Sequence, residues 1–141
     1  MQHLAAAGLL PTTASALPAL RLVQPRTVSD VLQALRDGER PVLLAGGTDL
    51  VASFNEGVLP SELIDLRNVE GLDRIDIHAK RLRIGASVTH HAGATHAGLR
   101  AACGGFSTAW GRIANPRIRF TGTLGGNLMA RRKRYEASVL L

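Results

Sequence analysis

Apolar residues gather in short runs in the first half of the chain, and turn-forming residues separate these runs. Residues 20–23, 42–45 and 63–66 are rich in Val, Leu and Ile, and they predict three strands. The run 42–45 is continuously apolar, which is typical of a strand buried on both faces of a sheet. A helical pattern follows the first run, and a glycine turn with a short helix follows the second. This order of elements predicts a parallel sheet.

The segment between the first two strands has the spacing of an amphipathic helix. Its apolar residues recur at i, i+3, i+4 and i+7 and form one face: Val28, Val31, Leu32 and Leu35. Thr27 precedes them as a helix cap, and Asp30 at the third helical position completes a weaker form of the capping box. Gly38 is expected to end the helix.

The pattern changes after residue 68. Arginine and aliphatic residues alternate strictly over residues 81–84, and aliphatic and polar residues alternate over residues 75–77. These two segments flank residues 78–80 and predict an antiparallel hairpin, apolar on one face and basic on the other.

Helices are expected in three further places. Thr48 or Asp49 caps a short helix that runs to about residue 55, and Thr89 caps another. Residues 99–113 predict a longer helix, which Gly104, Gly105 and Gly111 weaken and Pro116 ends. Residues 117–127 are expected to form strand, turn or loop.

Composition narrows the class of protein. The chain has 141 residues, 45% of them hydrophobic but only 4% aromatic, so the core is expected to be aliphatic, as in α/β proteins. The formal net charge of +6 suits an anionic ligand, an acidic partner or nucleic acid, without choosing among them. The single cysteine, Cys103, excludes an internal disulfide and fits a reducing, cytoplasmic compartment.

Both ends of the chain carry expectations of their own. Residues 1–19 hold two prolines and no clear period, so we expect a flexible N-terminal extension rather than a signal peptide, and no apolar run is long enough for a membrane span. Residues 139–141 are apolar and resemble the start of a helix with nothing after it to pack against. We expect that the sequence is incomplete or that a partner completes it.

Two glycine-rich turns carry the strongest functional signal. Residues 45–50 read Ala-Gly-Gly-Thr-Asp-Leu, and residues 122–127 read Gly-Thr-Leu-Gly-Gly-Asn. Glycines let backbone amides approach a ligand closely, and each turn adds a threonine hydroxyl. Neither turn matches the Gly-x-Gly-x-x-Gly fingerprint or a phosphate-binding loop. Either turn alone is more simply a strand-to-helix turn, but together they suggest a pyrophosphate held from two sides.

From about residue 20 to its end, the chain resembles the front part of the FAD-binding subunit or domain of the molybdenum hydroxylases. This family includes xanthine dehydrogenase, carbon monoxide dehydrogenase and related aldehyde and aromatic-heterocycle dehydrogenases. The resemblance rests on four segments that match in order and spacing: residues 44–50, 63–66, 82–89 and 118–127.

The resemblance implies an α/β (α+β) fold with two lobes and FAD between them. Residues 20–68 would form the first lobe, and residues 69–141 a second lobe that is truncated at its C-terminus. The cofactor-binding residues implied are Leu43, Leu44, Ala45, Gly46, Gly47, Thr48, Asp49, Leu50, Ile113, Gly122, Thr123, Leu124, Gly125, Gly126, Asn127 and Glu136. Glycine would keep side chains away from the diphosphate, and Ile113 would be an apolar flavin contact.

This chain departs from the family pattern at three places. Glu136 stands where the family usually has a cofactor-binding aspartate, and Phe120 stands where asparagine commonly follows Ile-Arg. The basic run 131–134 replaces a stretch that is often small and polar. That run is more simply a solvated segment or a partner-docking patch, and no aromatic residues interleave with it as in a nucleic-acid site.

The function implied is that of an electron-transfer subunit of an oxidoreductase, in which FAD takes electrons from iron–sulfur clusters and passes them to an external acceptor. The 2Fe-2S clusters and molybdopterin are expected on partner subunits, an iron–sulfur subunit and a molybdopterin-binding large subunit. No membrane or nucleic-acid partner and no catalytic side chain is expected. The alternatives are a scaffold fragment that docks partners without firmly held FAD, and a basic module that binds anions or nucleic acid.

The remaining reactive side chains have simple structural interpretations. His90, His91 and His96 lack the spacing of a zinc site, and we expect solvated histidines rather than metal ligands. Cys103 is expected to be a small residue in helix packing. Asp65 is expected to be an acceptor at the end of a strand and Asp73 a turn residue, not an acid/base pair.

Overall fold

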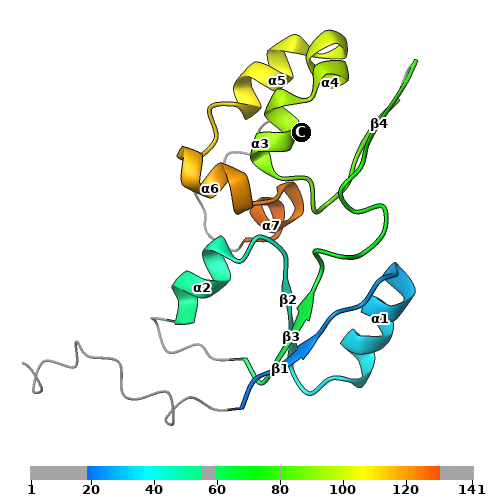
Figure 1. Ribbon diagram of the computed structural model, residues 1–141, viewed down its shortest axis with the longest axis vertical. Coiled ribbons are helices and arrows are strands. Elements are labelled where there is room, and N and C mark those ends of the chain that lie inside the picture. Colours follow the sequence, from blue (N-terminus) through cyan, green and yellow to red (C-terminus); the bar gives the residue numbers. More distant parts are fainter. Residues whose placement is uncertain (1–18, 55–59, 80, 131–141) are drawn as a thin grey trace, which may run out of the picture.

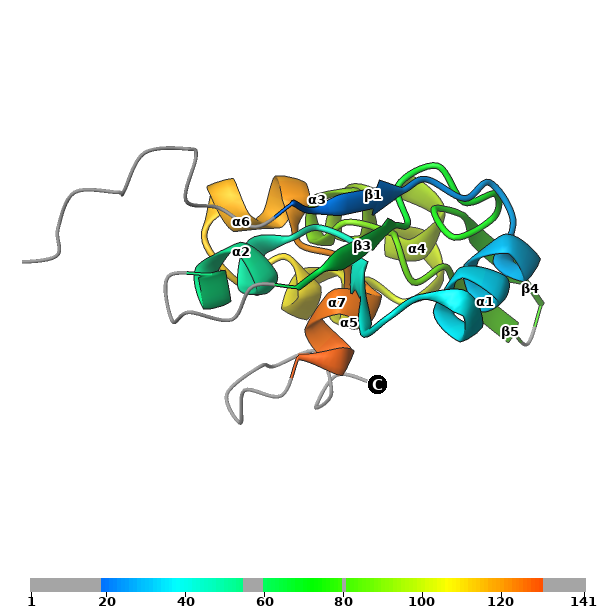
Figure 2. The same cartoon turned by 90° about the horizontal axis from the view of Figure 1, so that it is seen from below.

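The computed structural model describes residues 19–54, 60–79 and 81–130. A parallel sheet with two helices lies at one end of the molecule, and a group of five helices with a hairpin lies at the other (Figure 1). Seen from below, the sheet with α1 and α2 overlaps the later helices, because this view looks along the line that joins the two groups (Figure 2).

The first group is a three-stranded parallel sheet of β1 (Arg21–Val23), β2 (Pro41–Leu44) and β3 (Glu62–Asp65). The order across the sheet is β1-β3-β2, so the last strand in the chain lies at the centre. Both β1 and β2 pair with β3 in parallel register, with Val23 and Leu43 each opposite Ile64. The parallel sheet expected from the order of elements is therefore confirmed.

Helix α1 (Val28–Asp37) covers one side of this sheet and has the predicted ends. The Thr27 side chain accepts a hydrogen bond from the Asp30 amide at 3.1 Å, and the Asp30 carboxylate accepts one from the Thr27 amide at 3.2 Å, which completes the capping box. Gly38 caps the other end. Val31 packs with Ile64 and Val69 in a small core, and Leu35 lies against it.

Two expectations about burial in this group were wrong. Strand β2 is not buried on both faces, because Leu43 is 44% exposed; the buried strand is β3, all of whose residues are buried. The physical reason is the sheet order, which puts β2 at an edge and β3 in the middle. On α1, Val28 and Leu32 are exposed, since the narrow sheet covers only the part of the apolar face around Val31.

The hairpin consists of β4 (Ile75–His78) and β5 (Arg81–Ile84), paired antiparallel as predicted. Its polar residues are not only basic, because Asp76 and His78 lie opposite Arg83 and Arg81 in the register.

Five short helices follow the hairpin: α3 (His90–Thr95), α4 (Ala97–Ala102), α5 (Gly104–Trp110), α6 (Pro116–Thr121) and α7 (Leu124–Met129). The start of α3 at Thr89 is confirmed, since the Thr89 side chain accepts a hydrogen bond from the Ala92 amide.

Three sequence-based expectations in this region were wrong. The helix expected over residues 99–113 is divided at Cys103 into α4 and α5. Pro116 does not end a helix but begins α6, where Asn115 caps the first turn and proline needs no amide partner. Residues 117–127, expected as strand, turn or loop, form most of α6 and α7.

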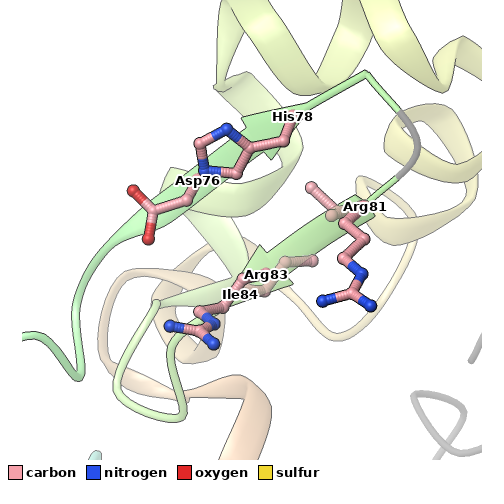
Figure 3. Close-up of a pocket in the computed structure, with 6 residues that line it drawn as sticks. Asp76, His78, Arg81, Arg83 and Ile84 are labelled. Carbon is pink, nitrogen blue, oxygen red and sulfur yellow. The ribbon is translucent and has the colours of Figure 1, made fainter.

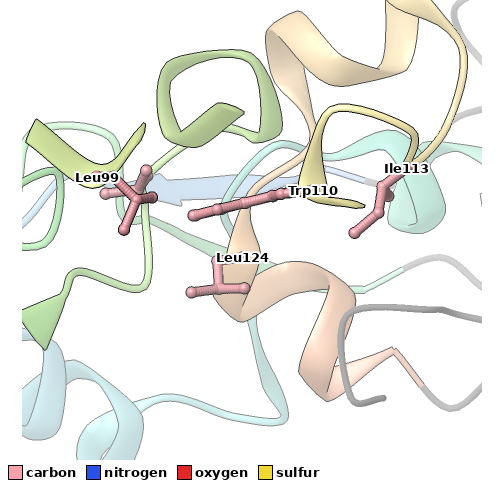
Figure 4. Packing of buried hydrophobic residues seen from close by; sticks show 5 residues of the cluster. Leu99, Trp110, Ile113 and Leu124 are labelled. Atoms are coloured by element: carbon pink, nitrogen blue, oxygen red, sulfur yellow. The ribbon is translucent and has the colours of Figure 1, made fainter. Parts of the chain in front are cut away.

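These helices pack around an aliphatic core that contains one large aromatic ring. Its buried members are Val88, Leu99, Trp110, Ile113 and Leu124, and Figure 4 shows how the last four lie. The side chain of Leu124 extends from α7 into this core beside Trp110, so the helix that carries the second glycine turn is anchored to α4 and α5. None of the helices within the described ranges is long and apolar enough to span a membrane.

Candidate functional site

The two glycine-rich turns are in direct contact. A Cβ atom added at Gly46 would lie 2.0 Å from the carbonyl oxygen of Thr121 and 2.9 Å from the Cα of Gly122. Both distances are far below van der Waals contact, so only glycine allows the two backbones to approach in this way. The turns thus meet where the two groups of elements meet, which is the arrangement that the paired motifs predict for a ligand held from two sides.

The first turn connects the end of β2 to the start of α2 (Thr48–Phe54). Gly47 has a φ of +70°, a left-handed conformation that side chains with a Cβ rarely adopt. Among the described residues, the amides of Gly46 and Gly47 have no hydrogen-bond acceptor. These are donors of the kind that bind anions in backbone concavities.

The carboxyl end of β2 is held firmly behind this turn. The Leu44 carbonyl accepts a hydrogen bond from the Leu66 amide at 2.9 Å, and the Gly47 carbonyl accepts one from the Val51 amide at 2.8 Å. Thr48 and Asp49, one of which was expected to cap this helix, are instead the first two residues of α2, and Asp49 places a carboxylate in its first turn.

The second turn is tied to the segment before α3. The Leu124 amide donates to the Val88 carbonyl at 2.9 Å, and the Gly125 amide donates to the Ala86 carbonyl at 2.8 Å. Gly125 also lacks room for a side chain, since a Cβ there would lie 2.8 Å from that of Ala86. Gly125 is therefore a packing residue between α7 and residues 85–88.

Thr123 caps α7 from within the second turn. Its hydroxyl oxygen accepts a hydrogen bond from the Gly126 amide at 3.1 Å, and the side chain is buried. The hydroxyl proton is still available to a further acceptor. The amides of Gly122, Leu124, Gly125, Gly126 and Asn127 all donate within the protein. The polar groups that this turn can offer to a ligand are therefore the hydroxyl and the amide of Thr123, since the amide has no acceptor among the described residues.

A buried histidine forms a hydrogen bond with the second turn. The His90 amide donates to the Gly122 carbonyl at 3.0 Å, and its imidazole Nδ1 accepts a hydrogen bond from Trp110 Nε1 at 2.8 Å. His90 is 2% exposed, so the expectation of solvated histidines was wrong for this residue. Gly93 makes space for the indole ring, which a Cβ would approach to 2.3 Å.

The other two histidines also have partners. His96 Nδ1 accepts a hydrogen bond from the Leu99 amide at 3.1 Å and so caps α4. The His91 ring stacks on Phe120 with centroids 4.1 Å apart. Within the residues that the structure describes, no group of three or more His, Cys, Asp or Glu side chains is placed to hold a metal ion.

Ile113 lies in the aliphatic core and is 3% exposed, pointing toward the side of Leu124 and Trp110 (Figure 4). Arg119 lies nearby on α6, where its guanidinium donates to the Gly111 carbonyl. The Arg119 Nε atom is buried without a partner among the described residues. The loop that carries Ile113 is thus held between α5 and α6.

Asp65, at the end of β3, is the strand-end acceptor that the sequence predicts. Its carboxylate is 1% exposed and forms an ion pair with Arg67 at 2.7 Å, a second bond to Arg67 Nε, and a longer one to Gln24 at 3.4 Å. The hydrogen bonds from Arg67 hold the pKa of Asp65 below its usual value, against the opposing effect of burial. The Asp65 carboxylate therefore ties β3 to the segment that follows it, beside the first turn.

Cys103 does not pack within a helix as expected. It is exposed at the junction between α4 and α5, where its own amide donates to the Leu99 carbonyl. Among the predicted site residues, Glu136 lies outside the described residues, as do residues 131–134 and 139–141. Asp73 lies in the turn before β4.

Sequence reasoning missed the part of His90 and Trp110 in supporting the second turn. The pair is separated by 20 residues, and only the packing of α3 on α5 brings the two rings together. One signal was present in the sequence: Gly93, three residues after His90, is a glycine inside a helix, which often marks a close packing contact.

Comparisons with known proteins agree with this geometry. The profile of the family described as FAD binding domain in molybdopterin dehydrogenase matches residues 18–141. The chain is 37% identical over 119 residues to the nicotine 6-hydroxylase medium subunit of Paenarthrobacter nicotinovorans, a match covering 79% of this chain and 40% of the relative. It is 33% identical over 106 residues to the carbon monoxide dehydrogenase medium chain of Afipia carboxidovorans, covering 74% and 37%.

Among solved structures, quinoline 2-oxidoreductase from Pseudomonas putida 86 superposes with a TM-score of 0.74 at 34% identity, covering 79% of this chain and 39% of that chain. The mixed α/β fold is therefore confirmed. The chain spans about two fifths of the length of these relatives.

Proposed function

Since the chain belongs to the family of FAD-binding domains in molybdopterin dehydrogenases, we propose that it forms the front part of the FAD-binding medium subunit of a molybdenum hydroxylase-type oxidoreductase. One observation carries the proposal: Gly46 and the Thr121–Gly122 backbone touch, so that two glycine-rich turns, one from each group of elements, lie side by side. A ligand with two adjacent phosphates matches a surface built from two turns.

The residues present fit a dinucleotide. The amides of Gly46 and Gly47 have no acceptor among the described residues. Gly47 adopts a left-handed conformation that favours glycine, and glycine has no Cβ that could stand between a ligand and the backbone. The Thr123 hydroxyl adds a donor from the second lobe. In this proposal these groups hold the diphosphate, and the other residues of 43–50 and 122–127 shape the backbone around it.

In this proposal the chain binds FAD and orients it. FAD, when bound, supplies the redox chemistry, and no side chain of this chain has to act as acid, base or nucleophile. The Asp65–Arg67 pair fixes the sheet behind the first turn, and the His90–Trp110 pair fixes the second turn. Ile113 forms part of the apolar support for the second lobe.

The inference about partner subunits rests on the relatives of this chain. They include a carbon monoxide dehydrogenase medium chain and a subunit of a 6-hydroxypseudooxynicotine dehydrogenase complex. We infer that this chain works in a similar complex, beside an iron–sulfur subunit that delivers electrons and a large subunit that carries molybdopterin. The oxidised substrate would then be bound by another subunit.

A second candidate is a scaffold that keeps the fold without firmly held FAD. It is favoured by the second turn, in which the amides of Gly122 and of residues 124–127 donate within the protein and are not available to a phosphate. The two candidates differ in one observable property, which is whether the folded chain retains a flavin.

The test is to purify the chain, denature it and identify any flavin released. Stoichiometric FAD supports the proposal. Gly47→Val is expected to lose it, since a branched residue strains a φ of +70° and crowds the amides that have no acceptor among the described residues. A folded protein that releases no flavin favours the scaffold. Release of FMN alone would contradict the proposal that the site binds a dinucleotide.

A further inference from the structure

His90 is bonded to both ends of the segment that leads into the second glycine turn. Its imidazole Nδ1 accepts a hydrogen bond from Trp110 Nε1 at 2.8 Å, and its backbone amide donates to the Gly122 carbonyl at 3.0 Å. Trp110 ends α5 and Gly122 begins the turn, so one residue of α3 fixes residues 110–122 at their two ends. Figure 4 shows the Trp110 ring inside the core beside Leu124.

The segment between these two points contains a strained residue. Ala114 has a φ of +56°, a left-handed conformation that a residue with a Cβ rarely adopts and that persists where surrounding contacts hold it. The Arg119 guanidinium donates to the Gly111 carbonyl across the same loop, and Ile113 is buried in the core. Release of either end of the segment therefore favours a different arrangement of the loop and of the turn that follows it.

The bond from Trp110 requires a particular protonation state of His90. A neutral imidazole has one nitrogen that accepts and one that donates, whereas an imidazolium has only donors. Because Nδ1 accepts from the indole, His90 is neutral, with its proton on Nε2. The indole can only donate, so a proton on Nδ1 would break the bond. His90 is 2% exposed, and water can replace the lost acceptor only if the core opens.

The charged groups around α3 do not stabilise an imidazolium. Helices α4, α5 and α6 pack against α3. Helix α5 has no titratable side chain, α4 carries Arg100, and α6 carries Arg117 and Arg119. The other imidazoles are His91 on α3 and His96, which caps α4. Residues 85–88 and α7 have no charged side chain. Every charged group on these elements is therefore a cation or becomes one in acid.

Carboxylates are also absent from this part of the sequence. Residues 77–130 contain no Asp or Glu. The acidic residue that precedes them is Asp76, which extends from the β4–β5 hairpin together with His78, Arg81 and Arg83 (Figure 3). That hairpin packs against α4. No carboxylate from residues 77–130 can compensate a charge on His90, and a buried charge without compensation favours opening of the core.

We propose that His90 is a positioning residue for flavin binding: its neutral imidazole holds the second turn in the arrangement that receives the diphosphate, and its protonation releases the turn. This inference rests on the proposed function, in which the Thr123 hydroxyl contacts the diphosphate. The flavin-bound form then requires neutral His90, and the released form accepts a proton. Flavin affinity therefore falls as the pH drops through the range in which histidine titrates, about pH 6–7.

Trp110 is the single tryptophan of the chain, so its fluorescence reports on this bond without any flavin. Between about pH 7.5 and pH 5.5, its emission is expected to shift to longer wavelength as the indole leaves the apolar core. His90→Asn keeps an acceptor close to the position of Nδ1 but does not titrate in this range, so its emission should stay constant. His91→Asn, on the same helix, is the matched control and should behave like the native chain.

The affinity for FAD is then measured by titration on the same proteins. From about pH 7.5 to pH 5.5, the Kd of the native chain and of His91→Asn should rise about tenfold, and that of His90→Asn by less than about twofold. His90→Leu fills a similar volume without an acceptor and should bind FAD about tenfold more weakly at both pH values. Circular dichroism checks folding, and His90→Gln serves if His90→Asn does not fold.

The results separate this inference from the proposed function. Constant Trp110 emission, or an equal shift in His90→Asn, would overturn the inference. An equal fall of FAD affinity in the native chain and in His90→Asn would do the same, since another group would then titrate. A shift in emission without a change in Kd would contradict the positioning role. A folded chain that binds no FAD at about pH 7.5 would instead contradict the proposed function, and the positioning role with it.

Discussion

At Gly46, the first glycine turn lies against the backbone of the second. No Cβ fits, since it would lie 2.0 Å from the Thr121 carbonyl oxygen, and a backbone atom cannot move aside as a flexible side chain would. We therefore expect Gly46→Ala to separate the two turns. The expected loss of stability is about 1–3 kcal/mol or more, accompanied by loss of flavin. Chemical denaturation and flavin content measure the two effects.

Gly105→Ala is the matched control for this substitution. Gly105 lies in α5, and no atom lies within 4 Å of the position that its Cβ would take. Alanine there should leave stability unchanged or raise it by about 0.5–1 kcal/mol, since alanine favours a helix more than glycine does. If Gly46→Ala behaves like Gly105→Ala, the close contact between the turns does not exist in solution.

Asp65 gives the fold a dependence on pH. Its folded-state pKa lies below the usual 3.8, mainly because of hydrogen bonds from Arg67. A lowered pKa means that the folded state favours the carboxylate, so the contribution of Asp65 to stability is complete above about pH 5 and is lost as the pH falls through the folded-state pKa. Arg67→Gln should therefore destabilise the protein at neutral pH and have much less effect in acid.

Urea denaturation at pH 7 and pH 3 measures this difference, with Arg26→Gln as the control. Arg26 is exposed and has no ion pair within the described part of the chain. An equal loss of stability at both pH values would mean that Arg67 acts through packing and not through the Asp65 carboxylate.

At the scale of elements, the ends of helices decide the arrangement of the second lobe. Thr89 and Thr123 cap α3 and α7, and they face each other as an isolated antiparallel bridge. Asn115 caps α6 through a hydrogen bond from the Ile118 amide. The turn that touches Gly46 is therefore positioned between two capped helices rather than within a strand.

Thr123→Val compared with Thr89→Val separates capping from ligand binding. Both substitutions remove a cap and should cost about 1 kcal/mol. If the Thr123 hydroxyl also donates to the diphosphate, only Thr123→Val should release flavin at matched stability, and Thr123→Ser should retain it. Flavin affinity in the three variants is the measurement, and equal loss from both valine variants would assign Thr123 to capping alone.

The sequence predicted the elements of the first lobe because their signals are local. Thr27, Asp30 and Gly38 mark both ends of α1, and each lies within four residues of its hydrogen-bond partner. The helices over residues 116–127 were not predicted, because proline and glycine usually interrupt helices. Here the cap at Asn115 and the packing of α6 on α3 stabilise helix in spite of these residues. The burial of β3 was not predictable, since chain order does not give the order of strands in a sheet.

At the scale of the whole molecule, the pairing of the two turns could be predicted from their motifs, but their contact could not. Gly46 and Thr121 are far apart in the chain, and the contact between them depends on the placement of the sheet, α2 and α6 (Figure 1). The different use of amides in the two turns was also hidden, because it depends on the carbonyls of Ala86 and Val88. The proposed site thus depends on how the two groups of elements pack together.

The most direct test of this account is the affinity of the chain for FAD compared with FMN, measured by titration of flavin fluorescence. A surface built from two turns predicts that the second phosphate and its amide contacts at Gly46 and Gly47 strengthen binding, so FAD should bind at least about tenfold more tightly than FMN. Equal affinity for the two flavins, or no binding of either by the folded chain, would contradict it.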